Sequence, residues 1–99
     1  MAEKNQVIDK NIVYIGTKPF MTYVTSVVMQ FTTKQKNEVT IKARGKFINR
    51  AVDVAEFVKN KFLKDKKLKI KDVKINSEEF ENKEGKKVSV SIIEIILIK

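Results

Sequence analysis

The sequence predicts a single α/β domain whose elements follow in the order β-α-β-α-β-β. Two segments with helical periodicity lie between β-favouring runs, and a short polar segment joins the last two runs, which favours a hairpin. At 99 residues, with 42% hydrophobic and 33% charged residues, the chain is large enough for one core but not for two. Residues 1–10 are polar and show no period, so we expect a flexible tail followed by one domain at 11–99.

The first strand and helix are expected on either side of Gly16. Ile12–Ile15 is a continuous β-favouring run, which is typical of a strand covered on both faces. Pro19 suits the first position of a helix, and a helical apolar period over 19–36 follows it. This period comprises Phe20, Val24, Val27, Val28 and Phe31. The β-branched residues of 22–28 favour a strand instead, but the period and Pro19 decide for a helix.

The second strand is expected at Glu38–Arg44, where apolar and polar residues alternate. Val39, Ile41 and Ala43 should face inward, and Thr40, Lys42 and Arg44 should face outward. A second helix is expected over 47–63, and its apolar stripe should pack on the sheet. The stripe comprises Ile48, Ala51, Val52, Ala55, Val58 and Phe62. Phe57 lies roughly opposite, either as a subunit contact or as a lone exposed aromatic.

The last two strands are expected at 68–80 and 87–98. The segment between them is polar and contains Gly85, so the pair should form a hairpin with an exposed tip. The alternation of apolar residues changes phase at Ile92 and Ile93. Either a β-bulge or a change from a projecting arm to a buried strand would explain this.

The charge of the chain indicates a polyanionic partner. With 21 basic and 12 acidic residues the net charge is +9, which suits nucleic acid or an anionic membrane surface, although a basic surface can also simply be solvated. The charge is unevenly placed, because residues 10–52 contain eight basic residues but one acidic residue, Glu38. Cysteine and histidine are absent and no serine has a candidate base, so we expect no enzyme, no metal site and no cofactor. The chain also has neither an apolar run of membrane-spanning length nor a signal-peptide core, so a soluble intracellular protein is expected.

Three basic segments are candidate phosphate-binding sites. The first is a platform at the junction of the second strand and second helix, formed by Lys42, Arg44, Lys46, Asn49 and Arg50. The second is the loop Gly16–Pro19, where free N–H groups and a helix N-terminus would meet Lys18, although such loops often bind nothing. The third is the hairpin tip, with Lys83, Lys86 and Lys87. Glu78, Glu79, Glu81 and Glu84 nearly cancel the tip lysines, so an ordinary solvated hairpin is equally compatible.

Several motifs in a fixed order resemble the Alba family of archaeal chromatin proteins. They are VYIGTKP (13–19), IKARGK (41–46), NRAVDVAE (49–56), KNKFL (59–63) and IEI (93–95). The resemblance runs from about Asn11 to Lys99. It implies a small two-layer sandwich, in which a four-stranded mixed sheet packs on two helices and an extended hairpin arm joins the third and fourth strands. It also implies a homodimer that binds double-stranded DNA, and RNA as well, with little sequence preference.

The resemblance also assigns residues. In the family two adjacent lysines of the first loop contact nucleic acid, and here only Lys18 remains because Thr17 replaces the other, which removes a site for acetylation. Lys42 and Arg44 match the family's Lys-Ala-Arg-Gly segment, followed by Lys46 in place of an arginine. The end of the second helix, around Asn60 and Phe62, corresponds to a contact between dimers. The arm carries lysines where relatives have arginines, and lysine makes no bidentate contacts.

Together these observations predict a homodimer that coats or compacts chromosomal DNA in the cytoplasm, without a membrane partner. The expected nucleic-acid contacts are Lys18, Lys42, Arg44, Lys46, Asn49, Arg50, Lys83, Lys86 and Lys87. The expected oligomer contacts are Phe57, Asn60 and Phe62. Two alternatives stay open: a primarily RNA-binding protein, for mRNA coating or a ribonuclease P role, and a structural module whose basic face meets an acidic protein.

Overall fold

The computed structural model describes residues 11–99, so the tail expected at 1–10 lies outside the described residues. The strands are β2 (Ile12–Tyr14), β3 (Glu38–Arg44), β4 (Lys69–Glu81) and β5 (Lys87–Ile98), and the helices are α1 (Phe20–Phe31) and α2 (Ile48–Phe57). A 3-10 turn, η1 (Gly45–Phe47), precedes α2, and a π-helical segment, η2 (Val58–Phe62), and a second 3-10 turn, η3 (Lys64–Lys66), follow it. The order β-α-β-α-β-β is confirmed.

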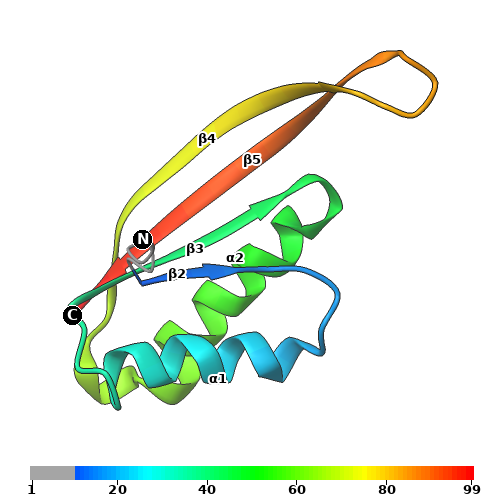
Figure 1. The fold of residues 1–99 in the computed structure, drawn as a ribbon. Helices are drawn as coiled ribbons and strands as arrows, with labels where there is room; N and C mark the ends of the chain where they lie inside the picture. The colour runs from blue at the N-terminus through cyan, green and yellow to red at the C-terminus, as the bar shows by residue number, and fades with distance from the viewer. Residues whose placement is uncertain (1–10) are drawn as a thin grey trace, which may run out of the picture.

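The four strands form one mixed sheet in the order β2-β3-β5-β4. β2 runs parallel to β3, whereas β3 with β5 and β4 with β5 are antiparallel pairs. Both helices lie on one face of this sheet (Figure 1). β4 and β5 continue past Arg44 and Ile92, the last pair between β3 and β5, and project as an arm, residues 77–91. The two-layer sandwich with an extended hairpin arm is therefore confirmed.

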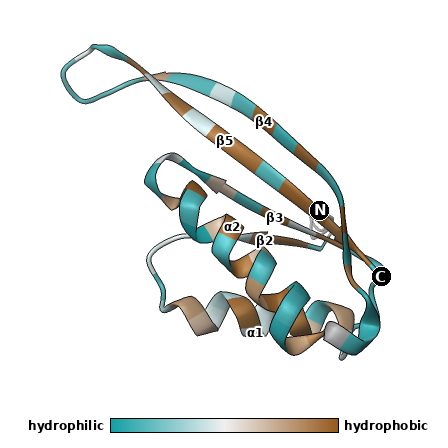
Figure 2. Ribbon diagram, turned by 180° about the vertical axis from the view of Figure 1, so that it is seen from behind, coloured by the Kyte–Doolittle hydropathy of each residue, from teal (hydrophilic) through white to brown (hydrophobic). Residues whose placement is uncertain are grey.

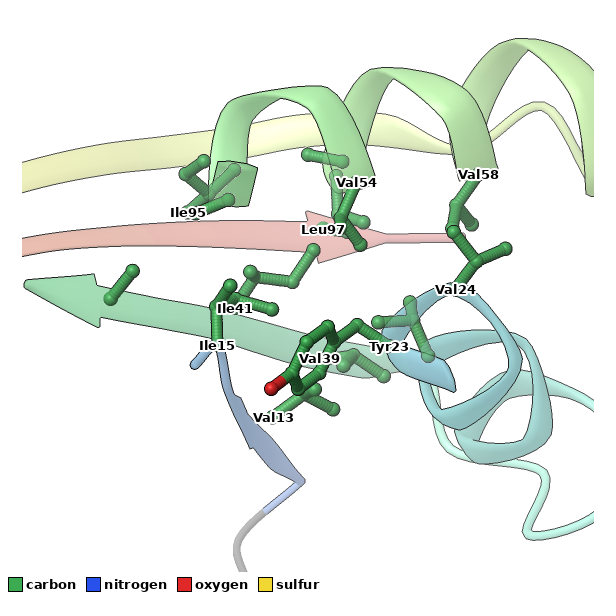
Figure 3. Close-up of a cluster of buried hydrophobic side chains, with 14 of the residues drawn as sticks. Val13, Ile15, Tyr23, Val24, Val39, Ile41, Val54, Val58, Ile95 and Leu97 are labelled. Carbon is green, nitrogen blue, oxygen red and sulfur yellow. The ribbon is translucent and has the colours of Figure 1, made fainter. Parts of the chain in front are cut away.

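The core lies between the helices and the inner face of the sheet (Figure 3). Its fully buried side chains include Val24, Val27, Phe31, Val39, Ile41, Val54, Val58 and Leu97. Hydrophobic residues recur along β5 and both helices, whereas the tip of the arm is hydrophilic (Figure 2). Along β3 the expected alternation is confirmed, because Val39, Ile41 and Ala43 are buried. Lys42 and Arg44 therefore lie on the outer face, which neither helix covers.

The expectation that the first strand is covered on both faces is wrong. Val13 is buried against the helices, but the side chain of Tyr14 is 65% exposed. The reason is the arrangement of layers, since both helices pack on the same side of the sheet (Figure 1). Within the described part of the chain β2 is also an edge strand, with β3 as its only neighbouring strand.

The first helix forms as expected but ends five residues earlier, at Phe31 rather than at 36. Thr32 donates its hydroxyl hydrogen to the carbonyl of Val28 at 2.9 Å, a local bond that competes with continued helix. The β-branched residues of α1 remain helical because burial of Val24 and Val27 outweighs their local preference. Tyr23, which the periodicity missed, is buried as well.

The second helix departs from its predicted stripe at two positions. Val54 is buried, whereas the side chains of Val52 and Phe62 are 40% and 49% exposed. The N–H of Leu63 bonds to the carbonyl of Val58, five residues earlier, so this last turn is wider than an α-helical turn. The wider turn rotates Phe62 away from the sheet and buries Leu63 instead. None of the helices between Asn11 and Lys99 is long and apolar enough to cross a membrane.

The hairpin is closed by a side chain at its tip. The Oδ1 atom of Asn82 accepts hydrogen bonds from the N–H groups of Glu84 and Lys86, and Gly85 turns the chain with a φ of +78°. Ile92 and Ile93 pair regularly with β4, so the phase change there is not a bulge. It marks the change from arm to buried strand, the second of the two expected explanations. The irregularity of the sheet lies in β4 instead, between Ile70 and Asp72.

Tyr23 connects the core to the loop between β2 and α1. Its ring is 6% exposed, and its hydroxyl oxygen accepts the backbone N–H groups of Gly16 at 2.9 Å and Lys18 at 2.8 Å. One buried side chain therefore sets the path of the loop that carries Lys18.

Replacing Tyr23 by phenylalanine keeps the ring in the core but leaves these two N–H groups without their acceptor. We expect Tyr23→Phe to lower the free energy of unfolding by about 0.5–1.5 kcal/mol for each lost hydrogen bond, the usual net contribution of such a bond, because both amides are only partly buried. Urea denaturation measures this change, and amide hydrogen exchange should quicken at Gly16 and Lys18. Unchanged exchange at both amides would contradict the assigned role of the hydroxyl.

Candidate nucleic-acid interface

The two strand cations of the platform are held by carboxylates from other strands. Lys42 lies 3.5 Å from Glu94 of β5, and Arg44 donates to Glu78 of β4 at 2.9 Å. The antiparallel register explains the first pair, because Lys42 stands directly opposite Glu94. Both pairs are partly exposed, so they stabilise the fold little, and they lower the positive potential around Lys42 and Arg44.

A second group of cations gathers where the β2–α1 loop meets the start of α2. Arg50 donates a hydrogen bond from its guanidinium to the backbone carbonyl of Lys18, which joins two segments far apart in the sequence. Lys46 is exposed nearby in η1, with its ammonium 5.5 Å from the ring centroid of Phe47. Within residues 11–99, Lys18, Lys46 and Arg50 form no ion pair with a carboxylate. We call these three residues the junction cluster.

At the phosphate seat expected at Gly16–Pro19, two of the N–H groups are already engaged within the loop. The N–H groups of Gly16 and Lys18 bond to the hydroxyl of Tyr23, and Pro19 has no N–H. The hydroxyl of Tyr23 therefore takes up two of the N–H groups of the loop, and the phosphate seat stays a prediction. The ammonium of Lys18 is exposed at this loop.

Gly45 allows the chain to turn from β3 through η1 into α2 within the platform. Its φ is +60°, a left-handed conformation that glycine adopts without strain. A Cβ atom there would also lie 3.2 Å from a methyl group of Val90 at the base of the arm. Gly45 therefore places the start of η1, which carries Lys46, close to the base of the arm, and Asn49 is exposed in the first turn of α2.

The arm carries its lysines at the exposed tip. Lys83, Lys86 and Lys87 are all exposed, and so are Glu79, Glu81 and Glu84. Glu78 instead bonds to Arg44, so one of the four acids expected to cancel the tip lysines is directed to the platform. The charge of Glu78 therefore acts on the platform rather than on the tip.

The residues expected at an oligomer contact lie at the other end of α2. Phe57 is half-buried and packs edge-to-face on Phe20, with ring centroids 5.5 Å apart, and its ring lies 5.6 Å from that of Phe62. Asn60 is exposed and donates to Glu56 at 3.1 Å. Phe57 and Asn60 line a groove of about 410 Å³.

Three residues near the platform escaped the sequence prediction: Tyr14, Glu78 and Glu94. The ammonium of Lys42 lies 6.0 Å from the ring centroid of Tyr14, its register partner on β2. No local pattern connects these residues to the platform, because each comes from a different strand. Only the strand register brings them together.

The sequence of this chain is similar to those of known Alba proteins. The family model described as Alba matches residues 11–77. The DNA/RNA-binding protein Alba of Methanococcus maripaludis is 46% identical over 90% of this chain and 98% of its own length. The DNA/RNA-binding protein Alba of Nanoarchaeum equitans is 52% identical over 88% of this chain and 96% of its own length.

Solved structures lead to the same family. Alba from Thermoplasma volcanium superposes with a TM-score of 0.81 at 43% identity, covering 90% of this chain and all of its own. ALBA1 from Trypanosoma brucei gives a TM-score of 0.61 at 28% identity, over 91% of this chain and 69% of its own. The matched family model, the similar relatives and the common fold show that this chain belongs to the Alba family.

Proposed function

We propose that the chain binds double-stranded DNA as a homodimer with little sequence preference, and coats or compacts the chromosome in the cytoplasm. The observation that carries this proposal is the junction cluster, in which three cations without carboxylate partners among residues 11–99 lie beside Lys42 and Arg44. Lysine and arginine side chains position a protein on phosphates without reading sequence. The names of the archaeal relatives, DNA/RNA-binding protein Alba, support a nucleic acid as the partner.

In this proposal the duplex backbone contacts the junction cluster first, and Lys42 and Arg44 join when phosphates replace their carboxylate partners. Asn49, exposed at the first turn of α2, adds a neutral contact. Lys83, Lys86 and Lys87 extend the contact along the groove from the tip of the arm. Affinity then comes mainly from counterion release and falls steeply with salt.

The homodimer is proposed to form through β4 and the neighbouring side of α2. On the helix-side face of the edge strand β4, the side chains of Ile70, Val73 and Ile75 are 38%, 48% and 80% exposed. Val52 of α2 is 40% exposed. A recess of about 360 Å³ between Ile48 and Ile75 continues this apolar strip. Such a strip fits a second copy of the same surface, as in an isologous two-fold contact.

Phe57, Asn60 and Phe62 are proposed to form a second contact, between dimers bound side by side. The exposed edge of Phe62 and the groove beside Phe57 offer an apolar knob and a recess on the same helix end. The RNA alternative uses the same cations, because a phosphate backbone is common to both polymers. Competition between duplex DNA and structured RNA at equal nucleotide concentration separates the two functions.

Three double variants, each removing two positive charges, test the interface. We expect Lys42→Ala/Arg44→Ala to reduce the slope of log affinity against log salt by about two units for duplex DNA. Lys18→Ala/Lys46→Ala should lower duplex affinity more than Lys42→Ala/Arg44→Ala does. The reason is that Lys18 and Lys46, which have no carboxylate partner among residues 11–99, can bind phosphate without first breaking an ion pair. Lys34→Ala/Lys36→Ala, exposed beyond the far end of α1, is the matched control. Fluorescence anisotropy measures the affinities. If all three variants lose the same affinity, binding depends on the net charge of the protein and not on this interface.

The ion pair between Arg44 and Glu78 should compete with phosphate. Glu78→Gln removes the competitor and is expected to raise duplex affinity about two- to fivefold, the range of an exposed ion pair. Glu79→Gln is the matched control, since it makes the same charge change on the opposite face of β4 and has no cationic partner in the described part of the chain. If both variants raise affinity equally in anisotropy titrations, Glu78 has no specific effect.

The β4 strip can be tested independently of nucleic acid. We expect Ile75→Lys to convert the dimer to a monomer, because it places a charge in the centre of the proposed contact. Sedimentation velocity without nucleic acid measures the mass. Met29→Lys, which adds the same charge at a half-exposed position of α1, should stay dimeric. A dimer that survives Ile75→Lys would place the subunit contact elsewhere.

A further inference from the structure

Tyr14 is an unusual surface residue in this fold. Its side chain is 65% exposed on the outer face of the sheet, where neither helix covers it (Figure 1). It belongs to β2, which is an edge strand of the sheet formed by residues 11–99. Its ring is thus held by a rigid strand while most of its surface stays open.

The surroundings of Tyr14 combine an aromatic ring with both signs of charge. Tyr14 lines a recess of about 280 Å³ together with Lys42, Arg44, Glu78 and Ile92. The ammonium of Lys42 lies over the ring, 6.0 Å from its centroid, and pairs with Glu94 of β5 at 3.5 Å. The recess therefore offers a ring for stacking, an apolar wall in Ile92, two cations and a carboxylate acceptor.

These features suit a nucleobase that is not paired within a duplex. Bases in single strands and loops stack on aromatic side chains presented by a sheet face, while flanking phosphates contact basic residues. A base within a duplex is already stacked on its neighbours and presents only its edge. A small recess beside one ring matches a single base rather than a larger ligand.

We propose that the Tyr14 recess binds an unpaired base of single-stranded nucleic acid, which stacks on the tyrosine ring while Lys42 and Arg44 contact the adjoining phosphates. This inference rests on the proposed function and extends it to a second substrate class, single-stranded segments such as RNA loops. The same platform then serves both substrates. Duplexes use its cations alone, and single strands use its cations and the ring.

The tyrosine content of the chain allows a direct test. The protein has no tryptophan and two tyrosines, Tyr14 and Tyr23, and Tyr23 is buried. We expect a twelve-nucleotide oligoadenylate to quench tyrosine emission when it binds, and a duplex of equal charge not to. Tyr14→Phe keeps only the emission of the buried Tyr23, so its loss of emission measures absorption by the oligonucleotide. If the wild-type and Tyr14→Phe proteins lose the same fraction of emission, Tyr14 does not stack on the base.

Affinities separate this inference from the proposed function. Tyr14→Ala should weaken binding of the single strand about tenfold and leave duplex binding within twofold, whereas Tyr14→Phe should retain both. Met29→Ala, at a half-exposed position of α1, should change neither. Comparing RNA with DNA of the same sequence shows whether the 2′-hydroxyl contributes. Equal effects of Tyr14→Ala on both substrates, or no effect, would overturn the recess, whereas a wild-type protein that binds no duplex would overturn the proposed function instead.

Discussion

The packing of both helices on one face of the sheet is the constraint on which the rest of the molecule depends. Burial of the alternate residues of β3 against α1 and α2 forces Lys42 and Arg44 to the opposite face. The same alternation places Glu94 on that outer face and buries Ile93 and Ile95. The hydrophobic core therefore decides which charged groups meet, although none of them belongs to it.

Features set by local pattern could be predicted from the sequence, and features set by register could not. The bounds of β3 and β5 follow from alternation within each strand, and the hairpin follows from its polar, glycine-containing turn. The exposure of Tyr14 depends on which side the helices occupy, and a continuous apolar run carries no such information. The predicted burial of Phe62 was wrong for a different reason. A π-helical turn at Val58–Phe62 breaks the α-helical period from which its position was predicted.

Cations close together in the sequence are not equally available to a ligand. Lys42 and Arg44 have no acidic neighbour along the chain, yet both are paired, since their acidic partners lie on β5 and β4. Lys18 is remote from the platform in sequence, yet Arg50 bonds to its carbonyl and joins it to the start of α2. The fold thus makes Lys42 and Arg44 less available to a ligand, and it brings together the cations of the junction cluster from two separate segments.

The arm and the strand β4 that supports it receive little packing within one subunit. Among the described residues β4 is exposed along its whole length and pairs only with β5, and in the arm β5 no longer pairs with β3. An isolated two-stranded hairpin is marginal in water, and a long apolar edge strand tends to pair with another chain. The apolar surface that β4 offers to a second copy consists of Ile70, Val73 and Ile75, which share its helix-side face. Covering these three residues in the proposed two-fold contact would stabilise the part of β4 that supports each arm and would give each dimer two platforms.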